Sequence, residues 1–409
     1  MPTPDISITA HFDAASADGL FILGDSLLGD TDVLGGDLPT EIGDFLDARR
    51  PITINRGRNG PLDPFTPGTC SIPIDDQDRT FDSLNASSPY AGSLVPGKRI
   101  TITAEGVTIY DGRARRWAHS YRQNAASATS LLCDDALGSL GRRPFAADWT
   151  ATAQLAGTRI GAVLDLPEVA FGANRDLDAG VNTLQADAVT AQSNVLTYLQ
   201  LVARSDLGRL FARRTGQLAF VDRASIATAP ILTFTDDGTG VDMERIERDD
   251  DLDTLITRVT VDRAAGTAQT VTNSTAEATY DLVNTLRMSG LLLGSDLDST
   301  SMANYLLGIY GQPEPRITEI EVNVTLIADG TLRGQVLALE LGDVVSATFT
   351  PLGIGDPVER LCIVERVRHT ITSTTHLMTV GLSSADNRMP FILGDAVYGV
   401  LGGPGVLAY

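Results

Sequence analysis

Short runs in which apolar and polar residues alternate constrain this chain more than any other feature of its sequence. They include residues 100–103, 256–261 and 317–324, which are rich in Val, Ile and Thr. Successive side chains of a strand point to opposite faces, so such runs predict antiparallel strands with one buried and one solvated face. The 39 Gly and 19 Pro favour turns between short strands. We therefore predict a mainly β protein with a few helices, a β-rich α+β fold.

Two segments carry a clear helical pattern. Residues 194–203 place apolar side chains at helical spacing after Ser193 or Asn194, either of which is a suitable N-cap. Residues 301–310 show the same spacing and are followed by Gly311 and Pro313, which commonly end helices. We expect both helices to support the fold and not to form a site.

One pattern occurs twice in the chain: an L-x-x-G turn, strands, an R-x-x-H segment, a further strand and an Asp. The first copy uses residues 94–97, 116–119 and 134–135, and the second uses residues 339–342, 366–369 and 386. The repeated order predicts two related β domains in one chain. The ends of the chain also resemble each other, because the sequence FILGD occurs at 21–25 and 391–395. We expect both apolar ends to form extended arms on a neighbouring molecule.

Composition excludes several classes of protein. The chain has 52 Asp and Glu against 31 Lys and Arg, a net charge of −21. Proteins that hold nucleic-acid phosphates or anionic membranes need a basic surface, so neither class fits. The sequence has no apolar run of about 18 residues and no secretory signal, so we expect no membrane anchoring. Cys70, Cys133 and Cys362 are too far apart for a disulfide framework or a metal site, and we expect buried thiols.

Acidic residues form two clusters. The first contains Asp75, Asp76 and Asp78, and the second contains Asp249, Asp250, Asp251 and Asp253. Neither cluster shows the D-x-D-x-D-G loop with a distant Glu that calcium-binding loops use. We therefore expect no metal and no cofactor.

The sequence also lacks the patterns of common active sites. The histidines, His11, His119, His369 and His376, show no metal-binding spacing. No nucleophile elbow, phosphate-binding loop or dinucleotide fingerprint is present. A glycosidase pair stays open, because any two of the 52 acids can form one. We predict that the protein is not an enzyme.

The most distinctive local run begins at Arg56-Gly57-Arg58. Its two arginines can form a basic patch for phosphate, or they can pair with nearby acids such as Asp63. The acidic composition favours ion pairing.

This run and the residues after it resemble minor tail proteins of phages that infect actinobacteria. In that family R-G-R, D-x-F, G-T, a strand, R-x-F-D and an S-P-Y turn follow one another. The matching residues here are Arg56, Gly57, Arg58, Asp63, Phe65, Gly68, Arg79 and Phe81. Residues 194–201, 216–223, 253–261 and 341–383 resemble the middle region and the second barrel of the tail-tip or baseplate hub of long-tailed phages. The resemblance covers nearly the whole chain.

The resemblance implies a homotrimer in which each chain carries two tube-like β-barrel domains, so that three chains place six barrels around one axis. It implies an N-terminal arm with the first strands at 1–50, a first barrel at 51–145, a mixed α/β middle domain at 146–250, a second barrel at 251–385 with a helical insertion near 281–312, and a C-terminal arm at 386–409. The 253–261 strand is expected to re-enter the second barrel.

A hub of this family closes the distal tail tube, adapts its six-fold symmetry to a three-fold fibre or spike, and lets DNA pass during ejection. Expected partners are the distal-tail ring protein, the tail tube, the tape-measure protein, and a central fibre or other minor tail proteins, with DNA only in transit. The expected location is the tail tip of the virion, after assembly in the host cytoplasm. We expect no lysozyme or peptidase module after the hub-like part, so that any lytic activity would belong to another chain.

A channel lined by carboxylates would repel DNA phosphates, so both acidic clusters are candidates for the channel lining; they can equally face outward. Two other functions stay open. One is a hexameric distal-tail ring protein with a single tube-like domain, which the repeat disfavours. The other is a protein that binds host cell-wall glycans, which the aromatic content of 6% disfavours. A tail-associated hydrolase would need catalytic residues that the sequence patterns do not indicate.

Overall fold

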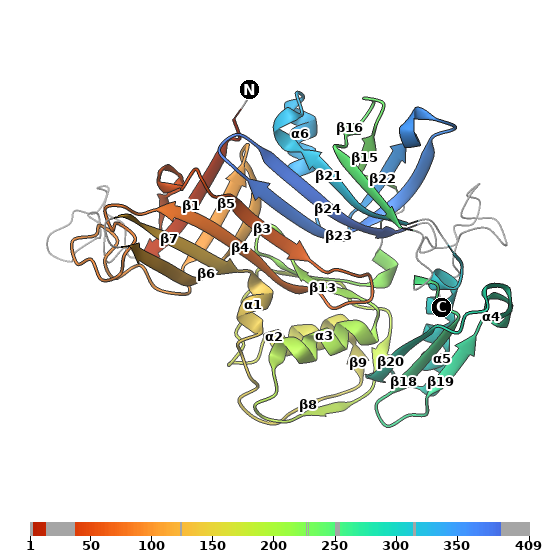
Figure 1. Cartoon of the computed structure of the whole chain (residues 1–409). Coiled ribbons are helices and arrows are strands. Elements are labelled where there is room, and N and C mark those ends of the chain that lie inside the picture. Colours follow the sequence, from red (N-terminus) through yellow and green to blue (C-terminus); the bar gives the residue numbers. More distant parts are fainter. Residues whose placement is uncertain are drawn as a thin grey trace.

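A computed structural model gives the fold (Figure 1) and describes residues 3–13, 37–122, 125–225, 227, 229–249, 254–313 and 316–385. In these residues it contains 24 strands and six α-helices, which confirms the prediction of a mainly β fold with a few helices. Fourteen of the described strands form one large sheet, and the others form four small sheets. The expected arms at 21–25 and 391–395 lie outside the described residues.

The first half of the large sheet has the strand order β2-β1-β5-β6-β7-β4-β3, and all its neighbours are antiparallel. The strands are β1 (Ile6–Asp13), β2 (Asp37–Glu41), β3 (Ile52–Gly57), β4 (Thr66–Asp75), β5 (Arg99–Ala104), β6 (Val107–Arg122) and β7 (Ala125–Asp134). The alternation in β5 has the predicted result: Ile100 and Ile102 are fully buried, and Thr101 lies on the opposite face.

The second half has the order β16-β15-β22-β23-β24-β21-β17. Its strands are β15 (Leu232–Thr235), β16 (Val241–Asp242), β17 (Arg245–Asp249), β21 (Arg316–Asn323), β22 (Val344–Phe349), β23 (Val358–Ile371) and β24 (His376–Ser384). β15 is parallel to both of its neighbours, and the remaining pairs are antiparallel. The large sheet therefore also receives strands from the segment 146–250, which we expected to form the middle domain.

Five strands of each half repeat one arrangement. The orders β5-β6-β7-β4-β3 and β22-β23-β24-β21-β17 correspond strand by strand, and every pair is antiparallel. Gly97 and Gly342, which end the two L-x-x-G turns, have φ of 96° and 90°. Their amides donate to the carbonyls of Ala114 and Val364, over 2.7 and 2.8 Å. A bulge follows each acceptor residue. The sequence repeat thus corresponds to two related five-strand units.

β3 and β23 join the two halves, and Figure 1 shows them side by side in the middle of the sheet. They are antiparallel, with a register from Ile371 opposite Ile52 to Arg366 opposite Gly57. β22 and β3 pair with successive parts of the same side of β23, while β24 pairs with its other side. Among the described strands the path of the large sheet stays open and no closed barrel forms, so the two-barrel architecture stays a prediction.

A mixed α/β part lies below the large sheet in Figure 1. Its elements are α1 (Ala136–Leu140), β8 (Trp149–Ala151), β9 (Gln154–Leu155), α2 (Ala156–Leu164), β10 (Arg175–Leu177), β11 (Thr183–Leu184), β12 (Asp187–Val189), α3 (Val195–Ser205), β13 (Arg209–Ala212) and β14 (Leu218–Val221). α3 begins as predicted, because the Asn194 side chain accepts a hydrogen bond from the Thr197 amide. Its buried Leu199 and Val202 join the core under the large sheet.

Residues 254–313 contain a smaller unit with its own core. Its elements are β18 (Arg258–Arg263), β19 (Gln269–Thr272), α4 (Ser274–Tyr280), β20 (Thr285–Leu291) and α5 (Asp296–Tyr310). The helix predicted at 301–310 is the later part of α5. The expectation that the 253–261 strand re-enters the second barrel is wrong, because β18 pairs only with β19 and β20 among the described strands. Val259 and Val261 pack in one cluster with Met302 and Leu306 of α5.

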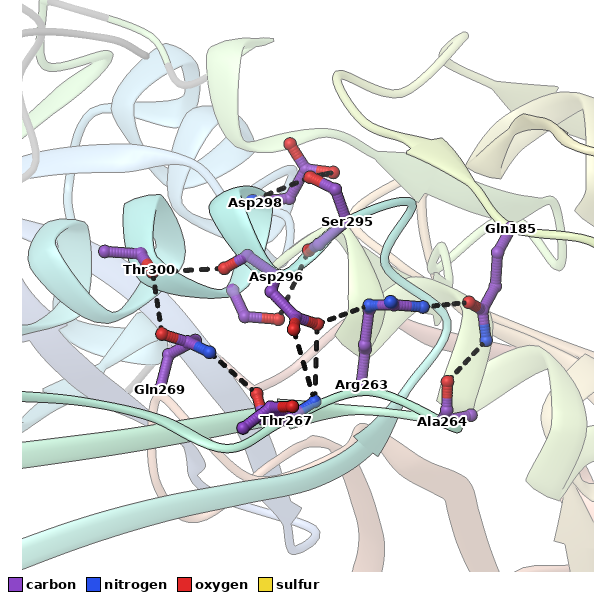
Figure 2. Close-up of polar contacts among 10 residues, drawn as sticks. Gln185, Arg263, Ala264, Thr267, Gln269, Ser295, Asp296, Asp298 and Thr300 are labelled. Carbon is purple, nitrogen blue, oxygen red and sulfur yellow. Dashed lines mark hydrogen bonds and ion pairs between the residues drawn. The ribbon is translucent and has the colours of Figure 1, made fainter.

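An ion pair and hydrogen bonds connect this unit to the α/β part. Figure 2 shows Arg263 between Asp296 and Gln185. Its Nε lies 2.7 Å from Oδ1 of Asp296, and its Nη1 lies 2.9 Å from Oε1 of Gln185. Gln185 in turn donates to the carbonyl of Ala264. The hydrogen bond and charge of Arg263 lower the pKa of Asp296.

The remaining helices are short. They are α6 (Gly330–Leu337) and the 3-10 helices η2 (Gly43–Phe45), η3 (Arg223–Ser225), η5 (Val324–Leu326) and η6 (Pro351–Gly353). None of the described helices has the length and apolar character needed to cross a membrane.

Candidate functional site: a polar sheet face above a buried ionic junction

The outward side chains of β17, β21 and β23 form a charged surface. This side of the strands carries Arg245, Glu247, Glu319, Glu321 and Arg366, whereas Ile246, Ile320 and Val367 point to the core. Glu319 bridges two arginines: its carboxylate oxygens lie 2.9 Å from Nη2 of Arg245 and 2.7 Å from Nη2 of Arg366. Arg245 also pairs with Glu247 and, at 3.5 Å, with Glu321.

The same face continues across β3 into the first half of the sheet. Arg368 and Thr370 of β23 face outward opposite Asn55 and Thr53 of β3, whereas the intervening His369 is buried opposite Ile54. We call this continuous surface of outward side chains from β17 to β6 the polar face.

Arg56 lies on the core side beneath the polar face and is 2% exposed. Its Nη1 lies 2.6 Å from Oε1 of Glu340 and donates to the carbonyl of Ala212 in β13. Glu340 also accepts hydrogen bonds from the amides of Leu341 and Arg214. Arg56 therefore connects the sheet, the α/β part and the turn before β22.

Arg58 forms a second buried pair. Its Nε lies 2.7 Å from Oε2 of Glu365, whose other oxygen accepts a hydrogen bond from Ser383. Arg58 also donates to the carbonyl of Asp63 and lies 4.5 Å from the ring centre of Phe65. We call the pairs Arg56–Glu340 and Arg58–Glu365 the ionic junction. Ion pairing is confirmed for both arginines, but the expectation of Asp63 as a carboxylate partner is wrong, because the chain brings distant glutamates to them.

Two glycines of the family motif are required by close packing. Gly57 has φ of 119°, and a Cβ there would lie 2.2 Å from the carbonyl oxygen of Glu365. A Cβ on Gly68 would lie 2.6 Å from Oδ2 of Asp135, which accepts a hydrogen bond from the Gly68 amide. At Gly57 the contact is with backbone atoms, so that position leaves no room for a side chain, whereas at Gly68 the Asp135 carboxylate would have to move.

The second part of the motif stabilises a loop after β4. Phe81 is buried in an aromatic cluster with Phe45, Tyr90 and Trp117. Arg79 has a positive φ of 58° and pairs with Asp82 at 2.6 Å. In the structure Arg79 and Phe81 thus contribute an ion pair and aromatic packing to this loop.

The acidic clusters are dispersed by the fold. Asp76 is 3% exposed and accepts hydrogen bonds from the Phe81 amide and the Thr129 hydroxyl, so its expected place in a channel lining is wrong. Asp75 is half-buried at the end of β4, and Asp78 and Asp249 are exposed. Asp250, Asp251 and Asp253 lie outside the described residues.

Sequence reasoning did not identify Glu340 and Glu365. Glu340 lies inside the second L-x-x-G turn, between two buried leucines, and Glu365 occupies the bulge of β23. The local sequence shows only an acidic residue between apolar ones, and this pattern does not indicate which cation the acid pairs with.

Two histidines are buried together on the core side of β23 and β24. Nδ1 of His369 lies 2.9 Å from Nε2 of His376. Burial, the other ring and the charge of Arg56 hold the pKa of His369 well below its usual value, and burial lowers the pKa of His376 to about 4. Burial also raises the pKa of Asp135 to about 7, against the opposing effect of the Gly68 and Gly138 amides.

These shifts predict lower stability in acid. Between about pH 6.5 and 4 the unfolded chain protonates both imidazoles while the folded chain does not, and Asp135 holds one proton only in the folded chain. The unfolded state therefore binds more protons, and stability falls as the pH falls. In urea unfolding at several pH values, His376→Gln should reduce this dependence by about 1 kcal/mol per pH unit. His11→Gln is the control, and equal slopes in wild type and His376→Gln would contradict the prediction.

A cleft of about 780 Å³ lies between α3, α5 and residues 61–65. Phe65, Tyr198, Tyr305 and Tyr310 line it together with charged side chains that include Arg204. Within the described part of the chain, no group of three His, Cys, Asp or Glu side chains is placed to hold a metal ion.

The fold is similar to those of two tail proteins of known structure. A 43 kDa tail protein of prophage MuSo2 from Shewanella oneidensis matches with a TM-score of 0.57 and 14% identity over 93% of this chain and 97% of that one. A tail protein from Neisseria meningitidis MC58 matches with a TM-score of 0.57 and 12% identity over 93% and 96%. No protein-family model matches this chain, and no curated protein matches its sequence. The actinobacterial origin stays a prediction.

Proposed function

We propose that this chain is the tail-tip hub of a long-tailed phage. Three copies would close the distal tail tube, adapt its six-fold symmetry to a three-fold fibre or spike, and let DNA pass during ejection. The observation that carries this proposal is the internal repeat, because three chains with two related five-strand units each supply six equivalent units. The fold shared with prophage tail proteins supports it.

In this proposal the tube-like domains correspond to the two halves of the sheet, and the second begins with β15. The hub would contact the distal-tail ring protein, the tail tube, the tape-measure protein and a central fibre or other minor tail proteins. It would assemble in the host cytoplasm, become part of the virion and perform no catalysis. The ionic junction would keep the two halves in a fixed relation, since charged groups buried in pairs define their own geometry.

We further propose that the polar face lines the DNA channel. Glu319 occupies the guanidinium groups of both Arg245 and Arg366, so these cations are neutralised before DNA arrives. Phosphates bind where unpaired Lys and Arg are available. Asp75 and Asp249, at strand ends, would add negative charge.

Glu319→Gln should therefore slow DNA ejection. The variant keeps the shape of the side chain and releases Arg366 to phosphate, while Arg245 keeps Glu247 and Glu321 as partners. The purified protein should therefore bind duplex DNA more tightly at low salt. The dependence of affinity on salt should steepen by about one released counterion. Glu105→Gln is the matched control, because it releases Arg333, which does not lie on the polar face. Equal DNA affinity in both variants would exclude the polar face as the lining.

Cryo-electron microscopy of intact tails tests the hub itself. Three copies that contribute six units below the tube are the expected result. Six copies with one unit each in the ring would instead support the distal-tail ring protein.

The aromatic-lined cleft keeps glycan binding as a second candidate, since such clefts suit sugar rings and other small ligands. Binding to cell-wall glycans that Tyr305→Ala abolishes would support it. Release of sugar or peptide fragments from host cell walls would instead support a tail-associated hydrolase.

A further inference from the structure

Besides the outer sides of β2 and β16, two strand edges of the large sheet have no partner strand in the described part of the chain. One is the side of β17 that faces away from β21. The other is the side of β6 that pairs with β5 only as far as Arg113, which leaves residues 116–121 unpaired on that side. An open strand edge presents a row of backbone donors and acceptors that can pair with another chain.

The internal repeat makes these two edges the counterparts of the joint inside the chain. β17 occupies the position of β3, and β6 occupies the position of β23. In the second unit, β23 pairs first with β22 and then, on the same side, with β3. In the first unit, β6 pairs with β5 as far as Arg113, and among the described strands none pairs with the next part of this side as β3 does with β23.

We propose that β17 of one subunit pairs antiparallel with residues 116–121 of β6 in a second copy of the chain, repeating the β3–β23 joint. The contact is heterologous, so it closes a ring when the rotation between subunits allows. The inference rests on the proposed function only for the number of copies in that ring.

The repeat also gives the register. In the joint inside the chain, Thr370 lies opposite Thr53 and Ile371 lies opposite Ile52. Superposition of the two R-x-x-H segments places Ser120 at the position of Thr370. Thr53 pairs with β4, and Glu247 pairs with the corresponding strand β21, so Glu247 takes the position of Thr53. Between subunits Ser120 therefore faces Glu247. Tyr121 follows at a bulge that β23 does not have, and it would lie near Ile246.

Exposure supports this register. The pair inside the chain, Ile371 and Ile52, is 3% and 4% exposed. Its counterpart Tyr121 is 56% exposed in the single chain, and Ile246 is only half-buried. The proposed joint would cover both apolar side chains, as the inner joint does.

Cysteine pairing in intact tails tests the joint. Full-length chains carrying both Ser120→Cys and Glu247→Cys should form disulfide-linked multimers on oxidation, in a ladder that ends at the trimer. Thr53→Cys with Thr370→Cys is the matched positive control, because it places the same pair in the joint inside the chain and should give a linked monomer. Ala118→Cys with Glu247→Cys is the out-of-register control and should link poorly. The native cysteines are buried in the single chain.

The proposed joint would be overturned if the subunits stay unlinked in tails that contain the protein while the control pair at Thr53 and Thr370 is fully linked. That result would leave the hub proposal intact. Absence of the protein from the tail tip would overturn the hub proposal instead. Hydrogen exchange gives an independent measurement should the control pair not oxidise. Those amides of residues 116–121 that point away from β7 should exchange at least tenfold more slowly in tails than in the isolated chain, and equal rates would overturn the joint.

Discussion

Gly57→Ala should destabilise the protein more than any other single methyl addition along the joint between the two halves. The new Cβ would lie 2.2 Å from the Glu365 carbonyl oxygen and 2.6 Å from Cα of Arg366, both of them backbone atoms of β23. The residue would also keep a φ of 119°, which L-residues rarely adopt. Strain and overlap together should cost about 3–5 kcal/mol, measured as the shift in urea unfolding followed by circular dichroism.

Two other glycines separate the causes. Gly92 has φ of 84° and open space where a Cβ would lie, so Gly92→Ala should cost only the strain, about 1 kcal/mol. Gly334 lies in α6 with open space and no positive φ, so Gly334→Ala should be neutral or stabilising. A loss in Gly57→Ala no larger than that in Gly92→Ala would show that β3 and β23 do not approach as closely as described.

Arg56→Met should cause a loss of similar size through the ionic junction. The substitution leaves Glu340, whose side chain is 10% exposed, without the cation 2.6 Å away. Removing one partner of a buried ion pair typically costs about 3–5 kcal/mol, because the remaining charge stays desolvated. Unfolding in urea measures the loss, and the transition should also broaden if the two halves begin to unfold separately.

The double variant Arg56→Met with Glu340→Gln should recover part of this stability, since it removes the unpaired charge. Arg213→Met is the exposed control. Arg213 pairs with Asp176 over a similar distance of 2.8 Å, but the two side chains are 31% and 56% exposed. Its loss should stay below about 1 kcal/mol. Equal effects of the two arginine substitutions would contradict the assigned role of the junction.

The sequence predicted the features that depend on local order. Alternation predicted β5 and β21, the Asn194 cap predicted the start of α3, and the repeated L-x-x-G turn corresponds to the equivalent Gly97 and Gly342 turns. Each of these depends on side-chain period or on a backbone conformation that few residues adopt.

Features that depend on distant contacts could not be predicted in the same way. Arg56 and Arg58 find partners 284 and 307 residues away, and no spacing rule connects such positions. The alternating run 256–261 looks like any other half-buried strand, and only its packing against α5 places it in the small unit. The sequence places Asp76 in an acidic cluster that resembles a solvated loop, whereas in the structure the loop containing Phe81 buries its side chain.

The connections between equivalent strands differ greatly in length. β3 continues to β4 through the short loop 58–65, whereas the corresponding passage from β17 to β21 carries the whole unit of β18–β20, α4 and α5. In the proposed ring of three chains, six similar sheet units would therefore alternate between a bare hairpin and a hairpin bearing a bulky appendage. The inner wall would keep nearly hexagonal regularity while the periphery has three protrusions. In such a ring a single asymmetric insertion would be sufficient to convert a six-part circumference into three attachment points.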